Sequence, residues 1–148
     1  MKWPLFAIAA AMLGSPSFAH AWLGGDVASV QADQQRMNAD VASTSTRGYT
    51  TYEMQTPSGT RVKEFVSPSG RVFAVAWQGP ALPDMRQLLG AFFTRYVTAD
   101  NALGAAAASR LIDEPGFVVQ AGGHMRAFVG RAYIPESIPA EVSVADLH

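Results

Sequence analysis

The chain has 148 residues, and its 11 lysines and arginines nearly balance its 12 aspartates and glutamates. A net charge of −1 excludes the strongly basic surface with which proteins neutralise nucleic-acid phosphates, so we expect no nucleic-acid partner. The lack of cysteine excludes disulfides, thiolate metal sites and cysteine nucleophiles, and leaves the fold to be held by its hydrophobic core.

The first 21 residues have the three parts of a secretory signal peptide. Lys2 supplies a positive charge, an uncharged apolar run covers Leu5–Leu13, and Ala19 and Ala21 are the small residues that signal peptidase requires. A membrane anchor is the alternative, but this run is about half of the roughly 20 residues that cross a bilayer. We therefore predict cleavage between Ala21 and Trp22, no stable membrane anchor afterwards, and a soluble periplasmic protein.

Residues 22–148 are long enough to form one domain around one core. Sparse apolar residues at helical spacing predict a helix over 27–41, with Asp26 as a possible N-cap. Residues 43–48 have no periodicity and are predicted to be a polar linker.

Three strands are predicted next, over residues 50–55, 60–66 and 71–77. Pro-Ser-Gly and Ser-Pro-Ser-Gly turns between them indicate an antiparallel meander. In the third strand we assign Phe73, Val75 and Trp77 to one face. Because the alternate residues are also apolar, this strand should be central and covered on both sides.

The strongest helical pattern begins at Asp84, which has capping-box spacing to Gln87. Apolar residues from Met85 to Tyr96 form one continuous face, and Gly90 within it suggests close packing against another backbone. The Ala-rich segment 100–109 is predicted to be either a further helical turn or a loop.

Two final strands are predicted over 117–120 and 125–134, joined by a tight hairpin at Gly122-Gly123. Gly130 is expected to mark a bulge or a close approach of another backbone, and residues 140–148 are expected to fray. Asp113-Glu114, before Pro115, suggests a turn. Together the elements predict an α+β fold: an antiparallel sheet of about five strands, made of a three-strand meander and a carboxy-terminal hairpin, with one or two helices packed on it.

Several unusual short motifs, in the order in which they occur, resemble a bacterial family of exported proteins catalogued as domain of unknown function 2844. The resemblance implies export and a single domain, and it implies no activity, cofactor or catalytic residue. The residues that carry it are Gly59-Thr60, 63–66, 70–77, Gly79-Pro80, 83–85, 88–90, Phe93, Tyr96, Val118-Val119, 122–128 and 130–135.

Two residues of the predicted hairpin, His124 and Arg126, are candidate contacts for a ligand or partner. Histidine is a common general base, but neither a nucleophile nor an orienting group can be identified beside it. A turn histidine that bonds the local backbone is therefore the favoured interpretation, and no catalytic residue is assigned.

Trp77, before a Gly-Pro turn, is the third candidate contact, as the lip of a ligand groove. The apolar pattern around it favours a core residue instead. Trp22 could either dock on a partner or cover the sheet.

Five cations are spread over the predicted strands and could share one solvent face as a site for an acidic ligand or partner. An ordinary charged sheet face is the favoured alternative. They are Arg61, Lys63, Arg71, Arg126 and Arg131.

Other chemistry has no recognisable residue pattern. A single His within the predicted domain, beside His148 at its end, cannot make a usual zinc site, so no metal or cofactor is expected. Nucleophile elbows, phosphate loops and paired glycosidase carboxylates are likewise not identified. The leading hypothesis is a non-enzymatic periplasmic protein that binds another envelope or exported protein. The alternatives are a small hydrolase using His124 with Arg126, and a small-ligand carrier with a groove between sheet and helix.

Overall fold

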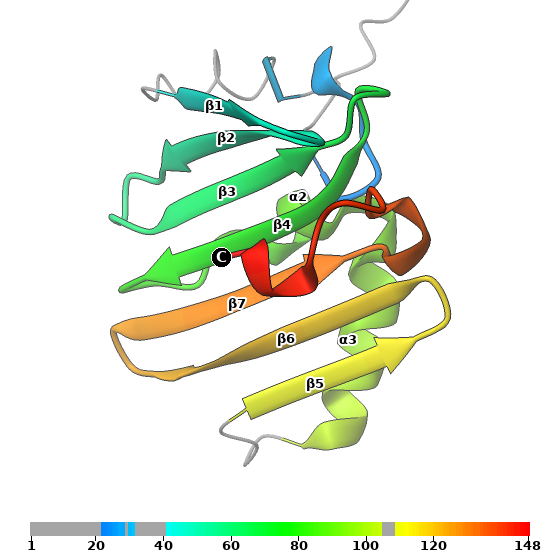
Figure 1. Ribbon diagram of the computed structural model, residues 1–148. Coiled ribbons are helices and arrows are strands. Elements are labelled where there is room, and N and C mark those ends of the chain that lie inside the picture. Colours follow the sequence, from blue (N-terminus) through cyan, green and yellow to red (C-terminus); the bar gives the residue numbers. More distant parts are fainter. Residues whose placement is uncertain (1–21, 29, 32–40, 105–108) are drawn as a thin grey trace, which may run out of the picture.

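The protein is built around one seven-stranded antiparallel sheet (Figure 1). The structure, a computed structural model, describes residues 22–28, 30–31, 41–104 and 109–148. The strand order is β1-β2-β3-β4-β7-β6-β5. The strands are β1 (Ala42–Thr46), β2 (Tyr49–Gln55), β3 (Arg61–Val66), β4 (Val72–Gly79), β5 (Ser109–Glu114), β6 (Phe117–His124) and β7 (Ala127–Tyr133).

Helical segments lie behind the sheet in the view of Figure 1. They are α2 (Met85–Leu89), the 3-10 turn η1 (Gly90–Phe92) and α3 (Phe93–Leu103). The carboxy-terminal tail, with 3-10 turns η2 (Pro135–Ser137) and η3 (Val144–Asp146), crosses the front face.

The prediction of about five strands is wrong, because the sheet has two more, one at each edge. β1 was expected to be a linker, and it consists of exposed Ala, Ser and Thr residues without any apolar alternation. β5 was not predicted as a strand: the Ala-rich segment that was expected to be a helical turn or a loop ends at Ser109, the first residue of β5, and Ile112 is the single buried residue of the strand. Residues 100–103 of that segment continue α3, and residues 105–108 lie outside the described part. Asp113 and Glu114 end this strand, and the turn comes after them, at Pro115 and Gly116. Edge strands bury few residues, so their hydrophobic signal in the sequence is weak.

The predicted meander is confirmed as β2, β3 and β4, and β4 is the middle strand of the seven. The assignment of Phe73 to the face of Val75 and Trp77 is wrong. The register shifts between Phe65 and Val66, so Phe73 is an extra residue in β4 at a β-bulge. Phe73 therefore packs on the opposite side of the sheet from Val75 and Trp77.

Asp84 caps the helical layer as predicted: its Oδ1 accepts hydrogen bonds from the amides of Arg86 (3.0 Å) and Gln87 (3.1 Å). The single helix expected after it is divided at Gly90, which has a φ of +52°. A Cβ at this position would lie 2.4 Å from Trp22 Cγ. The close neighbour of Gly90 is thus an aromatic side chain, where a backbone was expected.

The amino-terminal segment from Trp22 is docked between the helical layer and the sheet. The Leu23 amide donates to Leu88 O (3.0 Å), and the Gly24 amide donates to Val72 O (2.8 Å). Asp26, expected as an N-cap, forms an isolated β-bridge with Arg71. Of the predicted 27–41 helix, residues 27, 28, 30 and 31 are helical, and residues 32–40 lie outside the described part, as does the predicted signal peptide.

The tail was expected to fray, and this prediction is wrong. The Ser143 side chain and the Asp146 carboxylate form a reciprocal capping box around η3, which places Leu147 on the sheet. Leu147 is fully buried, in a cluster with Phe65, Phe73 and other residues of the front face. Leu147 is the fully buried apolar residue of this stretch, and the partly buried Ile138, Val142 and Val144 pack against the same cluster and help to hold the segment on the sheet.

Among the described residues, no helix is both long enough and apolar enough to span a bilayer.

If the tail is part of the core, Leu147→Ala should lower the free energy of unfolding by about 2–5 kcal/mol, the cost of truncating a buried leucine. Leu103→Ala is the matched control, because Leu103 is 46% exposed at the end of α3 and its truncation should cost at most about 0.5 kcal/mol. Urea denaturation followed by tryptophan fluorescence measures both. Equal, small effects would show that the tail contributes nothing to stability.

Candidate functional site

The tail covers only part of the front face, and a groove of about 560 Å³ lies beside it. Two rows of cross-strand partners, running from β3 through β4, β7 and β6 to β5, line this groove. The first row is Arg61, Gln78, Val129, Gly122 and Ser109, and the second is Lys63, Ala76, Arg131, Gln120 and Leu111.

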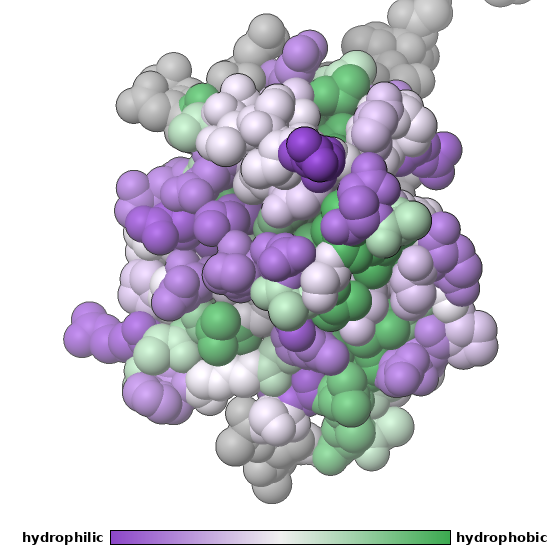
Figure 2. Space-filling view, viewed as in Figure 1, coloured by the Kyte–Doolittle hydropathy of each residue, from purple (hydrophilic) through white to green (hydrophobic). Residues whose placement is uncertain are grey.

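The groove owes its depth to small residues in the middle of these rows. Ala76 and Gly122 carry little or no side chain, whereas Leu147 and His148 of the tail form one wall. Two apolar side chains in the groove are open to solvent, Leu111 (61% exposed) and Val129 (50%). In Figure 2, patches of hydrophobic surface lie between the hydrophilic side chains on this face.

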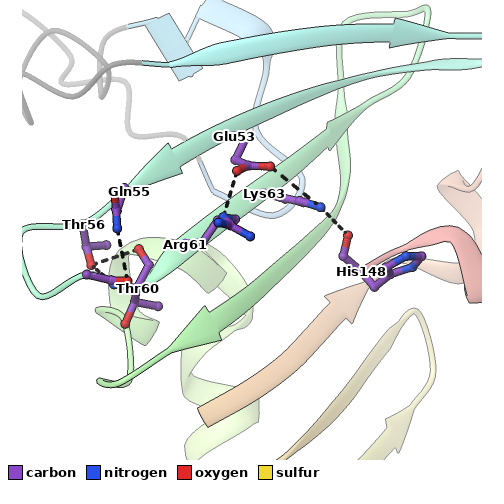
Figure 3. Close-up of polar contacts among 8 residues, drawn as sticks. Glu53, Gln55, Thr56, Thr60, Arg61, Lys63 and His148 are labelled. Atoms are coloured by element: carbon purple, nitrogen blue, oxygen red, sulfur yellow. Dashed lines mark hydrogen bonds and ion pairs between the residues drawn. The ribbon is translucent and has the colours of Figure 1, made fainter. Parts of the chain in front are cut away.

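The β3 side of the groove carries two cations and one carboxylate (Figure 3). Glu53, the cross-strand partner of Lys63, lies 2.9 Å from Arg61 Nε and 3.8 Å from Lys63 Nζ. Lys63 Nζ also donates to the backbone oxygen of His148 at 2.9 Å. The Arg61 side chain is 58% exposed, so this ion pair leaves much of the guanidinium open to solvent.

Arg131 is the third cation of the groove and also holds the tail in place. Its Nε donates to Gln120 Oε1 (2.8 Å), and its Nη1 donates to the carbonyl of Val144 (2.7 Å). These bonds fix the plane of the guanidinium on the rigid strands β6 and β7.

Thr60 anchors the β3–β4 end of the groove and is fully buried. Its hydroxyl donates to Ala81 O (2.6 Å) and accepts from the Ala81 amide (3.2 Å). Together with the β2–β3 turn contacts drawn in Figure 3, this clamp fixes the strand ends that carry Arg61 and Gln78.

Of the five cations predicted to share a face, the structure brings three together: Arg61, Lys63 and Arg131. Arg71 lies elsewhere, with Nη2 donating to Gly24 O at 3.1 Å. Arg126 is at the β6–β7 hairpin tip, where it has a φ of +69°.

The hairpin turn is Met125-Arg126, so the prediction of a turn at Gly122-Gly123 is wrong. β6 continues through both glycines to His124, which pairs with Ala127. The exposed His124 has its Nδ1 3.3 Å from the Met125 carbonyl. No hydroxyl or carboxylate of the described chain hydrogen-bonds to it.

Trp77 belongs to the core, 2% exposed, on the helical side of the sheet. A Cβ on Gly130 would lie 2.3 Å from Trp77 Cζ2, so the close neighbour of Gly130 is this indole, where a bulge or a close approach of backbone was expected. The indole Nε1 is buried without a hydrogen-bond partner among the described residues. Trp77 also borders the groove, but it is separated from His124 and Arg126 at the hairpin end.

Sequence reasoning missed an ion pair between Asp100 of α3 and Arg110 of β5. Burial, followed by the charge of Asp100, raises the pKa of the neighbouring Tyr96, while Arg110 acts in the opposite direction. The contact depends on the unpredicted strand β5. It ties α3 to the sheet edge and lies on the helical side.

A second, smaller cavity of about 240 Å³ lies between β2–β3 and the start of α2. It is lined by Met54, Val62 and Leu88 with the buried carboxylate of Glu64. In the part of the chain that the structure describes, no three His, Asp or Glu side chains come close enough together to hold a metal ion.

Fold and site define a small, mainly antiparallel sheet protein with one helical layer and a groove on its open face. The chain belongs to the family described as protein of unknown function, DUF2844, whose model matches residues 19–147. No curated protein and no solved structure matches the chain.

The contact of Trp77 with Gly130 gives a test of the groove's floor. Gly130→Ala should destabilise the fold by about 1–3 kcal/mol, the usual cost of overpacking. In a Trp77→Phe background the same substitution should cost less, because the smaller ring leaves room for the methyl group. Thermal unfolding of the four proteins in this cycle measures the coupling. Strictly additive effects would show that the two residues are not in contact.

Proposed function

We propose that this chain is an exported, non-enzymatic periplasmic protein that holds a segment of another envelope or exported protein in the groove. The observation that carries the proposal is the groove itself, an open cavity beside the tail on the front face of the sheet. Its volume of about 560 Å³ is in the range of sites that bind small molecules and short segments, about 300–1,000 Å³.

The chemistry of the groove favours binding over catalysis. The titratable residues that line it are Arg61, Lys63, Arg110, Arg131 and His148, and no Asp or Glu side chain is among them. Hydrolysis needs a base beside a nucleophile, and Lys63 and Arg131 instead hydrogen-bond to backbone oxygens of the tail. Exposed Leu111 and Val129 between polar groups are typical of a recognition surface.

Competing hypotheses have less support from the geometry. The hydrolase hypothesis depends on His124, whose ring nitrogen faces a backbone carbonyl. The carrier hypothesis requires a cavity between sheet and helix, and the one there has about 240 Å³, below the usual range.

Export is supported by the signal-like residues before Trp22. The docked contacts of the folded domain include those of Leu23 and Gly24, immediately after the predicted cleavage site. Removal of residues 1–21 would therefore leave these contacts intact.

Mass spectrometry of the periplasmic fraction of an expressing Gram-negative cell should find a chain that begins at Trp22. Ala19→Asp should block processing, because the protease requires a small residue there. Ala28→Asp, an exposed change of the same kind within the domain, is the control and should be processed normally. Full-length chains of the unsubstituted protein in the cytosol would contradict export.

A photoreactive amino acid placed at Val129 in cells should cross-link one reproducible protein, because this side chain lies in the groove. The matched control is Val97 on α3, also an exposed valine but on the helical side. Gel shift and peptide sequencing identify the adducts. Absence of an adduct from Val129, or the same adducts from both positions, would reject the groove as the binding site.

A further inference from the structure

We infer that the groove recognises an extended acidic segment, whose carboxylates are two residues apart, through Arg61, Lys63 and Arg131. This inference rests on the proposed function and adds the chemistry of the partner. The three cations lie on β3 and β7, within a groove that spans five strands, and Glu53 is the one side-chain carboxylate that pairs with them among the described residues.

The spacing of the cations favours an extended peptide. Arg61 and Lys63 are alternate residues of β3 and point to the same face, so their Cα atoms are about 6.6 Å apart. In an extended peptide, side chains at positions i and i+2 have the same separation and the same direction. Two glutamates separated by one residue therefore match the two cations in register.

Two of the cations are already oriented by hydrogen bonds to other parts of the chain. Lys63 donates to His148 O, and Arg131 donates to Gln120 and Val144. A carboxylate forms stronger, charge-assisted bonds than the neutral amide and carbonyl oxygens that Arg131 contacts. An acidic ligand would compete with Glu53 and the backbone oxygen of His148 for Lys63, while Arg131 stays fixed by Gln120.

The apolar part of the groove distinguishes a peptide from other polyanions. Val129 and Arg131 are alternate residues of β7 on the same face, and Leu111 of β5 lies across β6 from Arg131. A peptide can bring an apolar side chain to this surface, which a nucleic-acid backbone does not carry. Nucleic acids and anionic membranes bind most strongly to surfaces that carry many cations. This chain has a net charge of −1, and the groove holds only these three cations together with Arg110 at its edge.

Isothermal titration calorimetry with the full mature domain tests the inference. The probe is the peptide Leu-Ser-Glu-Ser-Glu-Ser, in which Leu and both Glu face one way, and its counterpart has Gln in place of each Glu. We expect the Glu peptide to bind at least about tenfold more tightly at low ionic strength, and this preference to shrink as salt is added.

Lys63→Gln should weaken binding of the Glu peptide about tenfold, the loss of one charge-assisted contact, and Lys63→Arg should retain most of the affinity. Arg47→Gln is the matched control, an exposed cation in the β1–β2 turn, and should leave affinity unchanged. The melting temperature of each variant shows that it is folded.

Equal affinity for the Glu and Gln peptides, or equal loss with Lys63→Gln and Arg47→Gln, would overturn the inference. Binding of phosphatidylglycerol vesicles that depends on Lys63, without peptide binding, would also overturn it and identify a membrane surface. A specific cross-link from Val129 with no preference for Glu would reject the acidic partner and keep the groove. If neither a specific cross-link from Val129 nor a preference for the Glu peptide is found, the proposed function itself is rejected.

Discussion

The fold depends on the burial of β4 on both faces. Six consecutive residues, Val72–Trp77, are at most 5% exposed, so each side of the sheet must be covered by another layer. α2 and α3 cover one side, and the tail covers the other around Leu147. Because the tail is a single narrow segment, it shields the centre of the face and leaves the remainder open. The groove is that remainder, and its cations remain accessible for the same reason.

Two glycines allow distant segments to come together. Gly130 accepts the Trp77 ring against β7, and Gly90 accepts the Trp22 ring at the break in the helical layer. In each case an aromatic side chain occupies the volume where a Cβ would stand. The first contact joins neighbouring strands beneath the groove, and the second joins the amino-terminal segment to the helices. A rigid sheet beneath the groove holds Arg131 and Lys63 at fixed positions, which favours recognition of a ligand with matching spacing.

The sequence predicted the elements with strong local signals and missed those defined by distant contacts. The β2–β4 meander and the Asp84 cap follow from alternation and capping chemistry, which act over a few residues. β1, β5 and the Leu147 tail have almost no hydrophobic pattern, since each is fixed by pairing or by a single buried side chain. The groove requires the register of five strands, which places Arg61 of β3 in one row with Ser109 of β5. Local patterns carry no such register, so the sequence indicated a shared cationic face but could not tell that Arg71 and Arg126 lie outside it.

The central claim, that the tail covers one part of the front face and leaves the other open, can be measured in solution. A neutral, soluble paramagnetic gadolinium chelate enhances the relaxation of methyl groups that it can approach. The account predicts strong enhancement for the Val129 and Leu111 methyls and almost none for Leu147 and Val118 on the same face. Enhancement of Leu147 equal to that of Val129 would show that the tail does not cover the sheet, and the groove would then have no wall.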